Sequence, residues 1–199
     1  MSTSYAAELL QFIKTNGFTA TPITTVAAYM TSEDPDMLPE RPLAIVIDDG
    51  SASIATHFEP RAADLGISYD VALVTGWMND GEGLDVDMGD GLSDRILTWQ
   101  DAKTLAQTGR VGFTSHSHSQ HRYADGGPEG TESGPAITTR LWNETGRWQE
   151  TNAERGLRVF DDLATSRKML EYQFGAPCTL LAWPYGVYDD IAETAALEA

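Results

Sequence analysis

The sequence has little cysteine and little positive charge, and each shortage excludes a class of protein. Its single cysteine, Cys178, excludes an internal disulfide framework and a zinc module built on cysteines. Thirteen Lys and Arg stand against 30 Asp and Glu, so the formal net charge is −17. This charge argues against a nucleic-acid partner, because binding to phosphates needs a basic face.

Long hydrophobic runs are also missing. No stretch approaches the ~18 consecutive apolar residues that a membrane-spanning helix needs, so we predict no membrane insertion. The first residues lack the basic region and apolar run of an export signal. The sequence does have enough apolar residues for a core: 41% of its 199 residues are hydrophobic, and five are Trp. Length and composition together predict a folded chain of about one domain.

Apolar runs alternate with helical patterns along the chain. Strands are predicted at 43–47, 70–75, 111–115 and 179–183, and helices at 5–16, 25–30, 52–65, 98–107, 151–174 and from 189 onwards. Loops are predicted at 31–41, 79–94 and 124–150, the last of these a long surface excursion. The alternation indicates βαβ units and a parallel sheet, so the predicted fold class is α/β. The unbroken apolar run at 43–47 is typical of a strand that is buried on both faces.

Three of the predicted strands end in polar or rigid motifs. The first motif is Asp48-Asp49-Gly50, the second runs from His116 to His121, and the third is Trp183-Pro184-Tyr185-Gly186. In parallel sheets and barrels, the chemistry lies at the carboxyl ends of the strands. We therefore expect the three motifs to converge on one site.

The adjacent carboxylates Asp48 and Asp49 can divide two roles between them. Successive side chains point in different directions, so one carboxylate can bind a metal while the other stays available as a base. The alternative is a simple turn from a strand to a helix, because Asp-Asp-Gly is common turn chemistry.

Three of the four histidines fall within six residues, at His116, His118 and His121. Imidazole is a frequent ligand of zinc and similar metals. A spacing of five does not align two rings on one helix face, but they could meet across a turn; a solvated loop with incidental histidines is the alternative. Two His and one Asp would leave coordination positions for water and substrate, as a hydrolytic metal site requires. A neighbouring carboxylate could then remove a proton from the water. This reasoning does not fix the substrate.

The third motif could form a pocket wall with a backbone N–H aimed at a developing oxyanion. The alternative is a turn at the exit of a strand, with Trp183 in the core. Trp142, Trp148 and Tyr188 could offer flat faces to sugar rings, although core packing is the commoner fate of such residues. We predict substrate contacts for Trp183, Pro184 and Trp142.

These motifs, in this order, resemble those of the polysaccharide deacetylase family (carbohydrate esterase family 4, the NodB-homology domain). The family's Thr-Phe-Asp-Asp-Gly corresponds to residues 46–50, and its His-Ser/Thr segment ending in a second His corresponds to 116–121. Its Pro-Tyr-Gly-like turn corresponds to 184–186. The spacing of five between the two histidines, with residues 134–142, 151–171 and 181–190, resembles the poly-β-1,6-N-acetyl-D-glucosamine N-deacetylase branch.

The resemblance covers about residues 5–199 and implies a distorted or incomplete (β/α) barrel. Residues 1–40 would be a helical lead-in to a deacetylase domain at 41–199. No residue matches the family's later motif with a catalytic His, so we expect a truncated domain, and a further C-terminal segment or domain in the full-length protein. As a separate departure from the family, Leu181-Ala182 stand where many relatives carry an Arg that orients the base. The resemblance also implies a periplasmic or extracellular location.

The resemblance assigns a role to each site residue. Asp48 would be the general base, and Asp49, His116 and His121 would hold one divalent ion, Zn²⁺ first, with Co²⁺, Ni²⁺ or Fe²⁺ also accepted. The backbone N–H of Tyr185 would help to hold the oxyanion. The implied reaction is hydrolysis of N-acetyl groups on a β-linked N-acetylglucosamine polymer, with release of acetate. Chitin, peptidoglycan or acetylxylan are alternative substrates, and a non-catalytic glycan-binding fragment is the third alternative.

Overall fold

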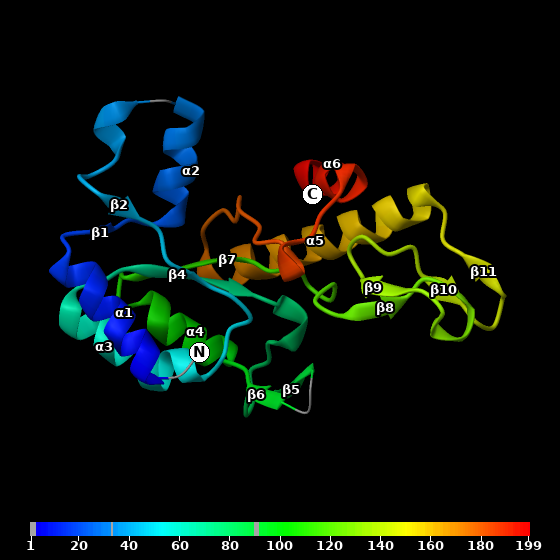
Figure 1. Cartoon of the computed structure of the whole chain (residues 1–199), viewed down its shortest axis with the longest axis horizontal. Coiled ribbons are helices and arrows are strands. Elements are labelled where there is room, and N and C mark those ends of the chain that lie inside the picture. Colours follow the sequence, from blue (N-terminus) through cyan, green and yellow to red (C-terminus); the bar gives the residue numbers. More distant parts are fainter. Residues whose placement is uncertain (1–2, 33, 90–91) are drawn as a thin grey trace. The chain divides into compact units, whose positions relative to one another are not determined.

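The computed structural model describes residues 3–32, 34–89 and 92–199 (Figure 1). The chain divides into two compact units. The first comprises Met1–Ala72 and Met78–Phe113, and the second comprises Leu73–Trp77 and Thr114–Ala199. None of the described helices combines the length and the apolar character that are needed to span a membrane.

The first unit begins with two helices and a small parallel pair of strands. The elements are α1 (Thr3–Thr15), β1 (Thr19–Ala20), α2 (Ile23–Ser32), a 3-10 turn (Pro35–Met37) and β2 (Pro42–Leu43). The helix predicted at 5–16 is confirmed, and it is followed by Gly17 in the left-handed conformation (φ 70°) that glycine adopts without strain. α2 extends beyond the predicted 25–30 in both directions.

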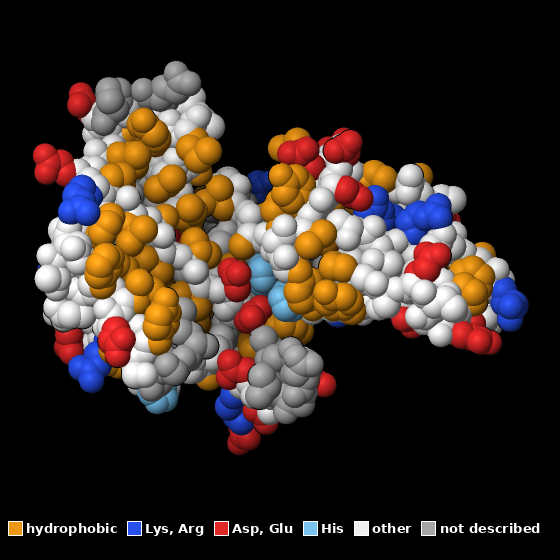
Figure 2. Space-filling model, in the orientation of Figure 1, with side chains coloured by type: hydrophobic (Ala, Val, Ile, Leu, Met, Phe, Trp, Pro, Cys, Tyr) orange, Lys and Arg blue, Asp and Glu red, His pale blue; other side chains and the backbone are white. Residues whose placement is uncertain are grey.

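The prediction of one buried strand over 43–47 is wrong. The run is divided between β2, which pairs with β1, and β3 (Val46–Ile47), which pairs with β4 (Tyr69–Leu73) in parallel. No residue of the run is buried, and Val46 is 37% exposed. The run instead lines a cavity of about 750 Å³, together with apolar residues of α1 and of the turn Ile54–Phe58. Figure 2 shows hydrophobic side chains gathered on this face of the first unit.

The central sheet has the strand order β3-β4-β7, where β7 is Val111–Ser115. Every residue of β4 is buried, including Asp70, so the buried strand predicted at 70–75 is confirmed with slightly shifted bounds. The helical segments between these strands are a π-helical turn (Ile54–Phe58), α3 (Glu59–Leu65) and α4 (Trp99–Ala106). The predicted N-cap Thr98 is confirmed, because its side chain accepts a hydrogen bond from the backbone N–H of Asp101. The alternation of parallel strands and helices confirms the predicted α/β class.

Segment 79–94, predicted to be irregular, contains an antiparallel hairpin instead. Its strands are β5 (Asp85–Gly89) and β6 (Leu92–Arg95). The alternation of Leu84, Val86 and Met88 with aspartates has the period of two that a strand requires. The high share of Gly and Asp in the segment hid this pattern.

The second unit is built around α5 (Asn152–Phe174), which begins with the predicted capping box of Thr151 and Glu154. The excursion at 124–150 contains two short antiparallel hairpins rather than only loop. Their strands are β8 (Tyr123–Asp125), β9 (Ser133–Pro135), β10 (Trp142–Asn143) and β11 (Trp148–Gln149), with a 3-10 turn at Pro128–Gly130. α5 packs against α6 (Asp190–Glu198) around a core of Ile137, Val159, Leu163, Ala192 and Ala195.

The strand predicted at 179–183 is reduced to one parallel bridge, between Leu181 and Ser115 of β7. Two backbone hydrogen bonds support the bridge: Ser115 N–H donates to Leu180 O, and Ala182 N–H donates to Ser115 O. The third motif follows this bridge as a 3-10 turn at Pro184–Gly186. The third motif therefore follows a segment that pairs with the end of β7, although this segment forms only a single bridge rather than a full strand.

Candidate metal and active site

The first motif lies directly at the carboxyl end of β3. Asp48 is exposed and Asp49 is half-buried. Gly50 is buried, and its carbonyl accepts a hydrogen bond of 2.8 Å from Leu97 N–H. This bond ties the turn that carries both carboxylates to the segment that precedes α4.

The second motif continues β7 into the second unit. His116 is only 2% exposed, and its backbone N–H donates to Leu73 O at the end of β4. Its ring Nδ1 lies 2.9 Å from Ala182 O. A carbonyl oxygen can only accept, so Nδ1 carries the hydrogen and Nε2 is the ring atom suited to a metal. A backbone carbonyl that fixes the tautomer in this way is typical of metal-binding histidines.

His121 meets His116 across the turn, which is one of the two alternatives that the sequence left open. Their ring centroids are 4.9 Å apart. The His121 ring also lies 4.4 Å from Tyr185 and 5.1 Å from Trp77, measured between ring centroids. Contacts with these two aromatic rings therefore restrict the orientation of the half-buried imidazole.

The third motif joins the histidines within the second unit. Tyr185 is 42% exposed, and its ring is 5.2 Å from that of Tyr123. Pro184 is buried, whereas Trp183 is half-buried against the core and stacks on Tyr188 at 5.3 Å. The structure therefore brings Tyr185 to the histidines and gives Trp183 a packing role as well.

Each of the three motifs contains a non-glycine residue with a left-handed backbone: Asp49 (φ 71°), Ser117 (φ 74°) and Tyr185 (φ 58°). Such residues cost about 1–3 kcal/mol each and cluster at functional sites. Three described non-glycine residues outside the motifs share this conformation, so the backbone conformation does not by itself set the motifs apart from other turns.

The three predicted metal ligands come from both units. Asp49 belongs to the first unit, whereas His116 and His121, whose ring centroids lie 4.9 Å apart, belong to the second. Carboxylate and imidazole donors suit Zn²⁺ and neighbouring divalent metals. The fixed tautomer of His116 is a second feature that fits such an ion.

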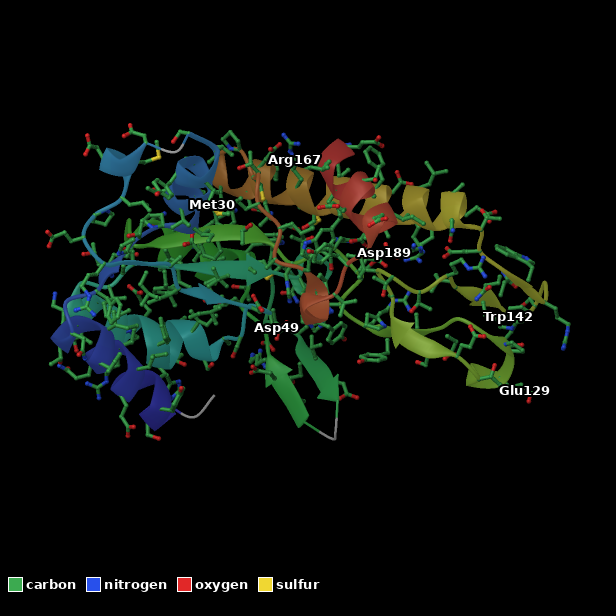
Figure 3. The ribbon with its side chains drawn as sticks, turned by 45° about the horizontal axis from the view of Figure 1, so that its top comes forward. Met30, Asp49, Glu129, Trp142, Arg167 and Asp189 are labelled. Carbon is green, nitrogen blue, oxygen red and sulfur yellow. The ribbon has the colours of Figure 1, made fainter. Side chains whose placement is uncertain are left out.

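Trp142, a predicted substrate contact, lies in β10 and is half-buried. Figure 3 shows it on the excursion of the second unit, where Glu129 also lies. Two further rings, Tyr123 against Tyr185 and Trp77 against His121, are not among the residues predicted from the sequence. Tyr123 lies two residues after the second histidine, so its place next to the motif was an available signal.

Comparison with known proteins identifies both the fold and the family. The family model described as polysaccharide deacetylase matches residues 36–199. The deacetylase domain of BpsB from Bordetella bronchiseptica is similar at 29% identity, with a TM-score of 0.84 over 96% of this chain and 72% of that one. A de-N-acetylase from Aggregatibacter actinomycetemcomitans is similar at 22% identity, with a TM-score of 0.85 over 100% of this chain and 74% of that one.

IcaB from Ammonifex degensii is similar at 16% identity, with a TM-score of 0.71 over 98% of this chain and 71% of that one. Comparison with curated protein sequences finds no significant match. The structural likenesses confirm the predicted α/β fold of the polysaccharide deacetylase type.

Proposed function

Because this chain belongs to the polysaccharide deacetylase family, we propose that it is a metal-dependent hydrolase that removes N-acetyl groups from a β-linked N-acetylglucosamine polysaccharide. The observation that carries the proposal is the pair of imidazoles at the end of β7, 4.9 Å apart, with His116 held by Ala182 O. The likeness to a solved de-N-acetylase supports an amide bond as the target. The resemblance of the motifs to those of the poly-β-1,6-N-acetyl-D-glucosamine N-deacetylase branch favours that polymer as the substrate.

Asp49, His116 and His121 would hold one divalent ion, with Zn²⁺ the first choice and Co²⁺, Ni²⁺ or Fe²⁺ as alternatives. When bound, such an ion polarises the acetyl carbonyl and lowers the pKa of water. The residues around the ion would orient the ligands, accept the proton and stabilise the oxyanion. His116 would present Nε2 because its Nδ1–H is committed to Ala182 O, which keeps the ring from turning away.

Asp48 would act as the general base. Its carboxylate is exposed, so water can reach it, and it directly precedes the proposed ligand Asp49. An Asp48 oxygen would accept the proton of the attacking water, and the glucosamine nitrogen would take up a proton as it leaves. The backbone N–H of Tyr185 would donate to the oxygen that becomes negative. The products would be acetate and a free amine on the polymer.

Exposed aromatic rings support a sugar substrate. Tyr185, which is 42% exposed, lies next to His121, and Tyr123, which is 62% exposed, lies next to Tyr185, so a sugar ring could stack on them. We also propose substrate contacts for Trp183, Pro184 and Trp142, and a location outside the cytoplasm, where such polymers are found.

The deciding assay is amine release from N-acetylglucosamine oligomers by metal-loaded protein, with β-1,6- and β-1,4-linked oligomers compared. Asp48→Asn should lower kcat by about 10²–10⁴, the usual contribution of a general base, and leave Zn²⁺ binding unchanged. Asp64→Asn, an exposed carboxylate on α3, is the matched control and should have no effect.

Failure to release amine or acetate from any N-acetylated glycan would overturn the proposed activity. Oligosaccharide binding without turnover would instead favour a glycan-binding role. Faster release from β-1,4 oligomers would move the substrate to chitin or peptidoglycan.

A further inference from the structure

The buried face of α5 carries polar residues where a core helix would ordinarily carry apolar ones. Arg158, Asp162 and Ser166 are spaced four residues apart, so they form one stripe along the helix. Asp162 is 7% exposed, and Ser166 is fully buried. Ser166 Oγ lies 2.8 Å from Ser115 Oγ, directly before His116. The stripe therefore faces the segment that carries both histidines.

The Asp162 carboxylate accepts four hydrogen bonds, all from the turn between the two histidines. Oδ1 accepts from His118 N–H at 2.8 Å. Oδ2 accepts from Ser119 N–H at 2.8 Å, from Ser119 Oγ at 2.6 Å and from Gln120 Nε2 at 3.0 Å. Two consecutive backbone amides are thus fixed by one side chain. Charge-assisted bonds of this kind are about twice as strong as neutral ones.

A second set of contacts holds the same turn through Gln120. Arg158 Nη1 donates to Gln120 Oε1 at 2.6 Å. The guanidinium also forms a two-point pair with Glu150, at 2.8 Å to Oε1 and 2.9 Å to Oε2. Burial opposes ionisation of Glu150, but hydrogen bonds from Arg158 and from Leu141 N–H outweigh it and hold the pKa of Glu150 below its ordinary value. The Gln120 amide is thereby fixed at both ends.

The two histidines lie on either side of this turn. The backbone N–H of His116 donates to Leu73 O, and its ring Nδ1 donates to Ala182 O. The His121 ring lies against those of Trp77, Tyr185 and His116, and its backbone follows directly on the turn 117–120. Ser117, at φ 74°, has a conformation that must be held from outside.

We propose that Asp162 is a positioning residue that holds the turn 117–120 so that His121 faces His116 and the pair is ready for a metal before the ion arrives. The inference rests on the proposed metal-binding role of the two histidines. Outer partners of metal ligands typically contribute 10–100-fold to metal affinity. Asp162 would not bond to a histidine ring; it would act on His121 indirectly, by holding the backbone of the turn that precedes it.

The test is Co²⁺ affinity, followed by the visible absorption of the bound ion, with the full chain. Asp162→Asn keeps the size but replaces one acceptor oxygen with a donor facing other donors. It should weaken Co²⁺ binding by about 10-fold or more and alter the absorption bands. Leu163→Ala is the matched control. It removes an apolar core side chain from the same helix and leaves all hydrogen bonds to the turn in place. It should lower the urea midpoint and leave the Co²⁺ affinity and spectrum of the folded protein unchanged.

If the folded Asp162→Asn variant binds Co²⁺ as tightly as the wild type and with the same spectrum, the positioning role of Asp162 is overturned. The proposed metal site would still stand. Should that variant fail to fold, Ser119→Ala removes a single side-chain bond to Asp162 from an exposed position. The Co²⁺ affinity should then fall about 2–10-fold, as expected for the loss of one ordinary hydrogen bond. Unchanged affinity in Ser119→Ala would then overturn it. A wild-type chain that binds no Co²⁺ would overturn the proposed metal site, and the inference with it.

Discussion

Two buried aspartates, one in each unit, show how differently the same side chain can be accommodated. Asp70 of β4 is 3% exposed and Asp162 of α5 is 7% exposed. Asp162 accepts four hydrogen bonds. Asp70 accepts one, from Ile23 N–H at 2.9 Å, and burial raises the pKa of its carboxyl against that bond. Burial of an Asp alone is therefore no sign of a built site, whereas the number of donors that converge on it is informative.

The largest effect in this comparison is expected from Asp162→Ala. The change leaves buried donors of the turn without their acceptor, which costs about 3–5 kcal/mol when a buried charge network is broken. Urea denaturation followed by circular dichroism measures the loss. Asp161→Ala, the exposed neighbour on the same helix, is the control and should stay within about 0.5 kcal/mol of the wild type. A loss of the same small size in both variants would show that the four bonds contribute little.

Gly112→Ala should have the next largest effect, and it tests how tightly Asp70 is enclosed. A Cβ at position 112 would lie 2.1 Å from Asp70 Oδ1, so the buried carboxylate must move. We expect a destabilisation of about 1–3 kcal/mol, as for overpacking. In the Gly112→Ala/Asp70→Ala double variant the clash is absent, so the two changes should be strongly non-additive. Additive effects would contradict the close approach.

Asp70→Asn should have the smallest effect and the opposite sign. The amide oxygen can still accept from Ile23 N–H, and no charge is buried, so we expect a gain of up to about 1 kcal/mol at pH 7. Because burial raises the pKa of Asp70, protonation stabilises the folded wild type below about pH 3.9. That contribution is lost as the pH rises through the raised pKa.

The advantage of Asn over Asp should therefore grow from pH 3.5 to pH 7. Urea midpoints of the two proteins at several pH values measure it, with Asp64→Asn as a control for charge alone. A difference that does not change with pH would contradict the sign of the shift.

The sequence predicts those parts of the fold that depend on residues close together in the chain. Helix caps at Thr98 and Thr151 rest on side chains three residues from their partners, and both are confirmed. The contact between the His116 and His121 rings was one of two alternatives left open by the sequence. A spacing of five residues shows only that the two rings would not align on one face of a helix.

What the sequence does not predict depends on partners far along the chain. The run 43–47 changes partner between β1 and β4, and nothing within the run marks that change. In the sequence, Asp162 is one of two adjacent aspartates on a charged helix. Its hydrogen-bond donors lie more than 40 residues earlier in the chain, so no local pattern reveals them. The four-residue spacing of Arg158, Asp162 and Ser166 was the available signal, but a polar stripe ordinarily faces solvent.

The zinc content of the full chain, after loading and removal of unbound metal, tests the metal site most directly. We expect about one Zn²⁺ per chain for the wild type, and loss of nearly all of it in His116→Ala and in His121→Ala. A wild-type chain without zinc, or full occupancy retained in both variants, would contradict the claim that these two imidazoles form the metal site.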